Sequence, residues 1–400
     1  MHKSVFIAIA VAAAAALSAA PISNIAASAA SGEAASNTSH GGGKNPTEIG
    51  KNCTPEEIER AQAGFQQPHL YPPPQLFPGE ERFLRNLRQL TFGGENAEAY
   101  WSPDGKKLSF QSKRDGGRAD QIYILDVITG ASRRVSNGQG VCTCSFFLGD
   151  NKRIVYASTF AEMPGAPPPP DYSKGYVWPV YRAYELYIAD SETGEILERL
   201  TDVAGYDAEC EGVDWTHGDR IVFTSARDGD LDLYALDPAK KTVERLTDLP
   251  GYDGGSFPSY DGSTIVWRRQ PAKTAEEIAD FRELLAAELV RPGHLEIWAM
   301  DRDGGNKRQL TDNGAANFGP NMSPGNERIV FCSNMNGGGR NFDLYVMSAQ
   351  GGAAERVTFY DGFDGFPMYS PDGKYLVFAS NRNGLVEGET NIFVAEWIND

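Results

Sequence analysis

Short apolar segments recur along this chain in a fixed order, with polar turns between them. Each unit has an apolar strand after a turn, then a strand that mixes aromatic and aliphatic residues, and it ends on a Thr or Ser just after an Arg. Self-similarity at a fixed period is the mark of a repeat architecture. The closing residues lie at intervals of 45, 65, 46, 64 and 47 residues and are Thr91, Ser136, Thr201, Thr247, Thr311 and Thr358.

Each unit is predicted to contain four short strands. In the first unit we expect strands at 98–101, 107–111, 121–126 and 133–136, with the turn Ser102-Pro103-Asp104-Gly105 after the first of them. Pro sets φ and Gly accepts a positive φ, so Pro-Asp-Gly between β-rich runs predicts a tight turn. A four-stranded unit of about 40 to 45 residues is typical of a β-propeller blade.

The last unit has only three predicted strands before Asp400, and a fourth strand, 85–91, precedes the first unit without sheet partners of its own. Pairing the two closes the ring and removes an exposed strand edge. The sequence therefore predicts an all-β fold, a six-bladed propeller over residues 81–400 that an N-terminal strand closes.

The N-terminal part has a different composition. Residues 1–29 have a basic start, an apolar run and small residues near Ala29, which predicts a secretory signal peptide and a periplasmic or secreted protein. Residues 30–80 are predicted to be a low-complexity tether, with a short helix at 54–63. We expect no membrane span after signal removal, and we expect a monomer.

Two units are long because of insertions, at residues 160–184 in blade 2 and 272–293 in blade 4. The first carries Tyr172, Tyr176 and Trp178 after a run of prolines. These aromatic residues are candidates for a peptide- or glycan-binding platform, and the alternative is that they pack on neighbouring blades.

The second insertion is predicted to be a helix. Thr274 and Glu277 have the spacing of a capping box, and Ile278, Phe281 and Leu285 recur on one face. This apolar face either packs on the propeller as a rim or serves as a lid or partner-binding surface.

The residues of two segments carry a family resemblance. Residues 89–100, Gln-Leu-Thr-Phe-Gly-Gly-Glu-Asn-Ala-Glu-Ala-Tyr, and residues 341–345, Asn-Phe-Asp-Leu-Tyr, resemble an exported bacterial branch of the TolB-type, WD-like propeller family. The resemblance covers about residues 84–400 and implies the propeller fold and a periplasmic location. TolB itself has an α/β domain before its propeller, where this chain has low-complexity residues, so the resemblance does not establish a Tol-Pal role.

Aligned on their turns, the units place an oxygen-bearing residue at one equivalent position in five of six blades. Carboxylate and amide oxygens without His suit Ca²⁺ or Mg²⁺, so a Ca²⁺ site at Asp207, Asp253 and Asp364 is one hypothesis. The alternative is that these residues cap loops by accepting backbone hydrogen bonds. Glu98 and Glu209, two positions further on, should share the channel wall. The equivalent residues are Asn96, Cys142, Asp207, Asp253, Asn317 and Asp364.

Five cysteines in an exported chain allow disulfides. Cys142 or Cys144 could bridge to Cys210, the pairing among these three and Cys53 stays open, and Cys332 is expected to be a buried free thiol. The net charge of −17 argues against nucleic acid and anionic membranes as partners.

Catalytic motifs are scarce: the sequence has no Gly-x-Ser-x-Gly, no His-Glu-x-x-His and no phosphate-binding loop. The first hypothesis is a non-catalytic binding scaffold that holds a protein, peptide or glycan at the channel mouth, with a divalent cation there. The second is a metal-assisted hydrolase or lyase that uses the acidic residues of the mouth.

Overall fold

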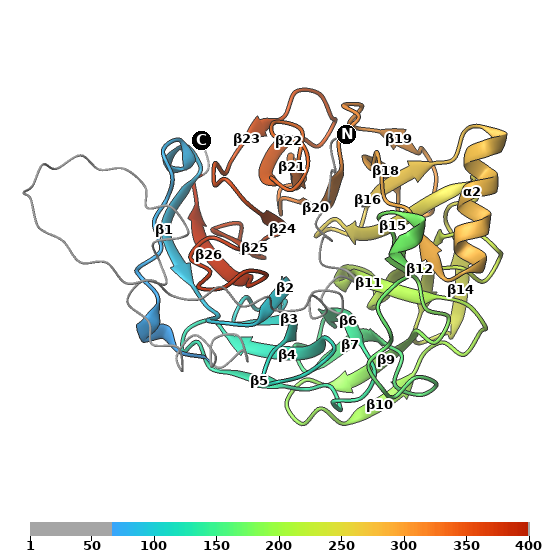
Figure 1. The fold of residues 1–400 in the computed structure, drawn as a ribbon, viewed down its shortest axis with the longest axis horizontal. Helices are drawn as coiled ribbons and strands as arrows, with labels where there is room; N and C mark the ends of the chain where they lie inside the picture. The colour runs from blue at the N-terminus through green and yellow to red at the C-terminus, as the bar shows by residue number, and fades with distance from the viewer. Residues whose placement is uncertain (1–65, 399–400) are drawn as a thin grey trace, which may run out of the picture.

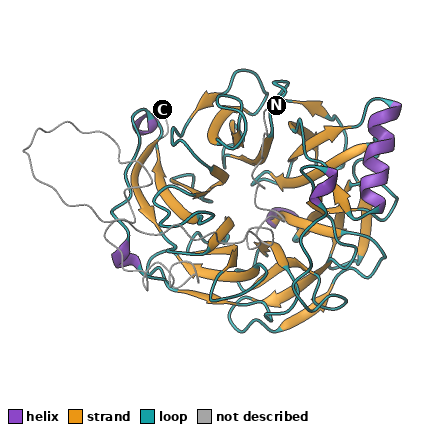
Figure 2. Ribbon diagram, viewed as in Figure 1, coloured by secondary structure: helices purple, strands orange, loops and turns teal. Residues whose placement is uncertain are grey.

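Six four-stranded antiparallel sheets are arranged as a ring around a central axis, the line of the predicted channel (Figure 1). The structure, a computed structural model, describes residues 66–398. The predicted signal peptide, the 54–63 helix and Cys53 lie outside these residues. Within residues 66–398, the all-β propeller with one α-helix agrees with the prediction (Figure 2).

The strands follow one another from the channel outward in each blade. Blade 1 consists of β2 (Glu95–Trp101), β3 (Lys107–Lys113), β4 (Gln121–Asp126) and β5 (Ser132–Arg134). Blade 2 consists of β6 (Cys142–Phe147), β7 (Arg153–Ser158), β9 (Glu185–Asp190) and β10 (Ile196–Arg199). Blade 3 consists of β11 (Asp207–Asp214), β12 (Arg220–Ser225), β13 (Asp232–Asp237) and β14 (Thr242–Arg245).

The second half of the ring repeats this order. Blade 4 consists of β15 (Gly251–Pro258), β16 (Thr264–Pro271), β18 (Glu296–Asp301) and β19 (Arg308–Gln309). Blade 5 consists of β20 (Asn317–Met322), β21 (Arg328–Ser333), β22 (Asp343–Ser348) and β23 (Glu355–Arg356). Blade 6 consists of β24 (Asp364–Tyr369), β25 (Tyr375–Ser380), β26 (Asn391–Trp397) and β1 (Leu84–Gln89).

The ring closes as predicted, because β1 supplies the outer strand of blade 6. Leu84 pairs with Trp397 and Gln89 with Phe393 in an antiparallel register with one irregularity. The pairing covers what would otherwise be the open edge of β26, and an open edge can pair with another chain. Short 3₁₀ helices at Pro68–Leu70 and Glu80–Arg82 precede β1.

The core lies between the blades. The second and third strands of each blade are buried along nearly their whole length, whereas the outer strand of blade 3 is exposed throughout. Neighbouring blades cover both faces of the middle strands, which explains why these strands are continuous apolar runs rather than alternating ones.

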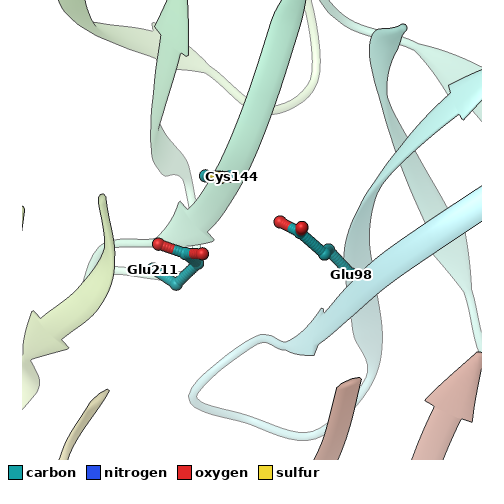
Figure 3. Close-up of side chains that lie close together, drawn as sticks. All are labelled: Glu98, Cys144 and Glu211. Carbon is teal, nitrogen blue, oxygen red and sulfur yellow. The ribbon is translucent and has the colours of Figure 1, made fainter. Parts of the chain in front are cut away.

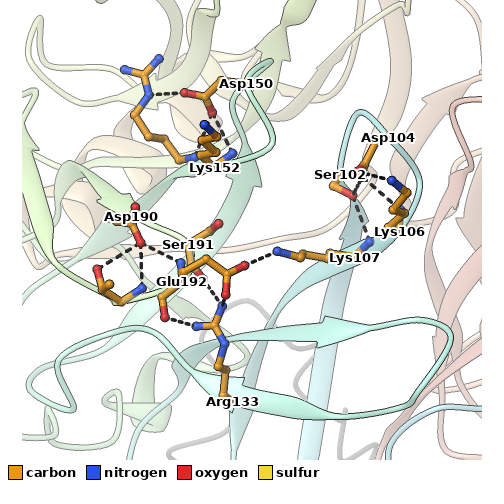
Figure 4. A network of polar contacts seen from close by, with 12 residues as sticks. Ser102, Asp104, Lys106, Lys107, Arg133, Asp150, Lys152, Asp190, Ser191 and Glu192 are labelled. Carbon is orange, nitrogen blue, oxygen red and sulfur yellow. Dashed lines mark hydrogen bonds and ion pairs between the residues drawn. The ribbon is translucent and has the colours of Figure 1, made fainter.

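Turn chemistry also links neighbouring blades (Figure 4). In the predicted turn of blade 1, Ser102 Oγ donates to Asp104 Oδ1 at 2.7 Å. Glu192 of blade 2 accepts from Lys107 and, at 2.7 Å, from Arg133, both in blade 1. The turn after the innermost strand therefore lies in a polar network at the junction of two blades.

The two insertions meet each other next to blade 3. Helix α2 (Ala275–Ala286) starts at the predicted capping box of Thr274 and Glu277. The strand after it, β17 (Leu289–Val290), pairs with β8 (Trp178–Pro179) of the blade 2 insertion, which also contains a 3₁₀ helix at Tyr172–Lys174. We call residues 172–182 and 275–290 the cap.

The cap has a small core of its own, made of Val177, Leu284 and Leu289. The apolar face of the helix is thus covered in part by the other insertion. Within residues 66–398, no helix combines the length and the apolar character needed to cross a membrane.

We predict that Leu84→Ala lowers the free energy of unfolding by about 2 to 5 kcal/mol, because Leu84 is fully buried in the closing strand. Arg85→Ala, at an exposed position of the same strand, should change it by less than about 0.5 kcal/mol. Urea denaturation followed by intrinsic fluorescence measures both. Equal effects of the two substitutions would contradict a stabilising role for the closing strand.

Candidate functional site

The six residues aligned from the sequence do occupy equivalent positions at the start of the inner strands. Each pairs with a residue near the end of the second strand, and this partner is Ser in five blades and Arg269 in blade 4. The pairs are Asn96 with Ser112, Cys142 with Ser158, Asp207 with Ser225, Asp253 with Arg269, Asn317 with Ser333 and Asp364 with Ser380.

The carboxylates of this ring are held by arginines within their own blades. Asp207 accepts from Arg227 at 2.9 Å, and Asp364 accepts from Arg382 at 2.7 Å. Asn96 is bonded to Arg114 in the same way. These arginines stand two residues after the paired Ser, so a recurring Ser-x-Arg in the sequence was a signal for them.

Blades 4 and 5 vary this arrangement. Asp253 pairs with Arg269 and also accepts from Trp267 Nε1 at 2.7 Å. Asn317 donates to the carbonyl of Leu295 at 2.8 Å and to Glu296 at 3.1 Å.

All ring members are fully buried. Arginines within each blade bind the carboxylates of Asp207, Asp253 and Asp364, which do not meet around one point. Among residues 66–398, the only three His, Cys, Asp or Glu residues whose ligand atoms lie within 4.8 Å of one another are elsewhere. The predicted Ca²⁺ ligands therefore form three separate ion pairs.

Glu80, which the sequence analysis did not single out, joins one of these pairs. It lies in the predicted tether region, it is fully buried, and both its oxygens accept from Arg382 at 3.0 Å. Burial alone would lower the pKa of Arg382, but Asp364 and Glu80 together hold it above its ordinary value. The segment before β1 is therefore fixed to blade 6 by a buried ion triad.

Two residues further along each inner strand, the chain forms a bulge. The bulge residue has a positive φ of 52° to 59° in every blade, a conformation that non-glycine residues seldom adopt. Blades 1 to 3 place polar side chains at this position, and blades 4 to 6 do not. The six residues are Glu98, Cys144, Glu209, Gly255, Gly319 and Phe366.

The bulge of blade 3 is one residue longer than the others. In blade 3, Ala208 pairs with Thr224 and the next pair is Gly212 with Val222, so the inner strand advances four residues where its partner advances two. In blade 1, the inner strand advances three residues, from Ala97 to Tyr100, where its partner advances two. The extra residue allows blade 3 to contribute both Glu209 and Glu211 to the interior.

Glu98, Cys144 and Glu211 come together in the interior (Figure 3), with ligand atoms within 4.8 Å of one another. At most 2% of the surface of each residue is exposed. Both carboxylate oxygens of Glu98 and Oε2 of Glu211 have no hydrogen-bond partner among the described residues. We call these three residues the channel cluster.

Glu209, beside the channel cluster, is fully bonded. It accepts from Arg268 at 2.9 Å, from Tyr252 at 2.6 Å and from the backbone amide of Gly255 at 2.7 Å. A Cβ on Gly255 would lie 2.1 Å from Arg268 Nη1, so glycine at this bulge makes room for the guanidinium.

The channel cluster resists ionisation. Burial, and then Glu211, raise the pKa of Glu98 well above its usual range. Burial, followed by the charge of Glu209, raises the pKa of Glu211 to about 7. Burial, with Glu211 and Glu98 adding to it, also raises the pKa of the Cys144 thiol.

Aromatic side chains lie on two sides of this interior. Two residues beyond the bulge, Tyr100 packs against Phe146 and Phe257 with ring centroids 5.6 and 5.2 Å apart. Trp178 of the cap packs edge-on against Tyr252, and the guanidinium of Arg268 lies 5.9 Å from the Trp178 ring. The cap is thus in direct contact with the residues that hold Glu209.

The three aromatic residues of the predicted platform lie in different environments. Trp178 is only 4% exposed and Tyr176 accepts its Nε1 hydrogen at 2.9 Å, whereas Tyr172 is 41% exposed. Trp178 therefore packs on the propeller, and Tyr172 faces solvent.

A groove of about 290 Å³ lies between the cap and blade 3. Val180 and Leu285 line the cap side, Tyr206 and Ala226 line the blade side, and Arg182 and Arg282 also border the groove. Tyr206 donates to Glu209 at 3.1 Å, so one wall of the groove contacts the interior network.

The proposed disulfide is wrong, because Cys142, Cys144, Cys210 and Cys332 are all free and buried. Cys210 Sγ instead donates to the carbonyl of Cys144 at 3.0 Å. The prediction of a buried free thiol at Cys332 is confirmed.

A family model and curated relatives relate this chain to TolB-type propellers. Residues 280–396 match the family described as "TolB beta propeller domain". A Tol-Pal system protein TolB of Francisella tularensis subsp. holarctica is 25% identical over 61% of this chain and 47% of its own length. An uncharacterised protein of Agrobacterium fabrum is 27% identical over 67% of this chain and 86% of its own length.

Solved structures show the same fold. TolB from Acinetobacter baumannii superimposes with a TM-score of 0.53 at 21% identity, over 70% of this chain and 59% of that one. A putative TolB from Agrobacterium tumefaciens gives 0.52 at 18% identity, over 78% of this chain and 97% of that one. The chain spans about half the length of the Francisella relative.

We predict that Arg382→Met lowers the free energy of unfolding by about 3 to 5 kcal/mol, because two buried carboxylates, Glu80 and Asp364, lose their cation. Arg227→Met is the matched variant, since it removes the cation of Asp207 alone. It should lower the free energy of unfolding by less than Arg382→Met does. Urea denaturation at pH 7 compares the two. A smaller effect for Arg382 than for Arg227 would show that the triad does not fix the segment before β1.

A second prediction concerns pH. Burial, and then the charge of Glu95, raise the pKa of Asp120 to about 7, so the folded state binds its proton more tightly than the unfolded chain, where the pKa is about 4. The contribution of Asp120 to stability should therefore fall as pH rises from about 4 to 7, by at most about 1.4 kcal/mol per pH unit.

Asp120→Asn removes this contribution. Its stability relative to wild type should increase across the same pH range and level off above pH 7, which denaturation curves at several pH values can measure. A difference that does not change with pH would contradict the assignment.

Proposed function

We propose that this chain, which carries a TolB-type β-propeller, is a non-catalytic scaffold that binds a protein or peptide segment in the groove between its cap and blade 3. The groove is the observation that carries the proposal. It is lined by apolar side chains and bordered by two arginines, in a chain whose net charge is −17.

The size and chemistry of the groove favour part of a peptide over a whole small substrate. Its volume of about 290 Å³ is at the lower end of the range for small-molecule sites, roughly 300 Å³ upward. Arg282 is exposed and forms no ion pair with another described residue, so it can bind an acidic group of a partner. The expected ligand is an acidic segment with an aliphatic or aromatic side chain beside the carboxylate.

The similarity to proteins named for the Tol-Pal system is consistent with protein binding. The match covers 47% of the Francisella relative, and the partners of that protein are not transferred to this chain. The signal-peptide pattern of residues 1–29 and the TolB resemblance support a periplasmic or secreted location.

Metal-assisted hydrolysis or elimination is the alternative function. Such chemistry needs carboxylates that a substrate can reach. Asp207, Asp253 and Asp364 are fully buried and paired with arginines, which favours the scaffold over this alternative.

Selection of a random heptapeptide library on the immobilised protein tests the proposal. We expect enriched peptides with Asp or Glu next to an apolar residue. Their affinity should fall by about tenfold or more in Arg282→Glu, because like charges then face each other.

Arg340→Glu, at an exposed position in blade 5, is the charge-matched control and should bind like wild type. Peptides that bind Arg282→Glu as tightly as wild type would place the binding surface elsewhere.

A further inference from the structure

We propose that the channel cluster, Glu98, Cys144 and Glu211, is a binding site for one divalent transition-metal ion of the zinc class. This site is distinct from the Asp207, Asp253 and Asp364 positions and from the groove. Three adjacent blades each supply one ligand, from β2, β6 and β11.

The unsatisfied oxygens are the first observation. Glu98 is 1% exposed, its two carboxylate oxygens have no partner among the described residues, and Figure 3 shows its carboxylate directed toward the space between Glu211 and Cys144. Burying such a group without partners is costly, because the hydrogen bonds it made with water are lost. A bound cation would satisfy both Glu98 and Glu211 Oε2.

The charge balance around the cluster is the second observation. Three carboxylates, Glu98, Glu209 and Glu211, interact electrostatically with one another and with the guanidinium of Arg268. Arg268 donates to Glu209 at 2.9 Å and to Tyr252 at 2.6 Å. The nearby positive charge is thus directed at Glu209, and a divalent ion would balance the other two carboxylates.

The chemical nature of the three ligands favours one class of metal ion. Ca²⁺ and Mg²⁺ prefer oxygen ligands only, whereas Zn²⁺ accepts a thiolate together with carboxylates. Three protein ligands leave one tetrahedral position for water. Binding displaces the thiol proton of Cys144 and any proton on the two carboxyl groups, and these protons go to solvent.

The backbone gives the site its geometry. Glu98 and Cys144 are bulge residues with φ values of 54° and 55°, and the longer bulge of blade 3 brings in Glu211. Gly255 and Gly319 occupy the same bulge position in blades 4 and 5, so the bulge itself needs no side chain there.

Cobalt(II) titration of the metal-free protein tests the proposal. The full chain, without an affinity tag, is treated with a chelator under reducing conditions and then titrated with Co²⁺. We expect a thiolate-to-cobalt charge-transfer band in the near ultraviolet that saturates at one ion per chain, and a rise in melting temperature with Zn²⁺.

Substitutions assign the band to the cluster. Cys144→Ser should abolish it, and Glu98→Gln should weaken Co²⁺ binding by more than about tenfold, the loss seen even when outer partners of a metal site are removed. Cys332→Ser, at another buried thiol, is the matched control and should keep both the band and the affinity.

Three results would overturn the proposal. The first is wild-type protein that shows neither the band nor a shift in melting temperature with Zn²⁺. The second is a band that persists in Cys144→Ser. The third is stabilisation by Ca²⁺ but not by Zn²⁺, which would indicate a site built from oxygen ligands alone. The wild-type measurement remains decisive even if a variant does not fold.

Discussion

The pairing of β1 with β26 is the contact on which the rest of the ring depends. Every other blade is formed by four strands from one continuous segment of the chain, but blade 6 needs β1, which lies more than 300 residues before its partner β26. That pairing joins the two ends of the described chain in one sheet and so closes the ring. The buried triad of Glu80, Arg382 and Asp364 fastens the same junction from the channel side.

Local signals predicted the repeat well, because each blade is built from contacts close in sequence. The Ser102–Gly105 turn, the capping box at Thr274 and the equivalence of Asp207, Asp253 and Asp364 all follow from spacing. Spacing alone could not reveal what those carboxylates bind, since Arg227 and Arg382 reach them from the neighbouring strand. The recurring Ser-x-Arg is the sequence signal that accompanies these pairs.

Two other features depend on contacts that no local pattern encodes. The cap forms because Trp178–Pro179 pairs with Leu289–Val290, two residues from each of two insertions about 110 residues apart. The channel cluster forms because blade 3 has one extra bulge residue, which a repeat alignment treats as a minor irregularity. The departures from sixfold regularity therefore coincide with the places where the chemistry is concentrated.

The positions of the described chain ends have a consequence for attachment. The Ile398 amide donates to the carbonyl of Phe83 beside β1, and Gln66 bonds to the backbone of Phe92 just after β1, so both ends of the described chain lie next to the closing strand. Blade 3 and its groove lie three blades away, on the opposite side of the disc (Figure 1). A group joined at residue 66 would therefore lie beside the closing strand, on the side of the ring away from the groove.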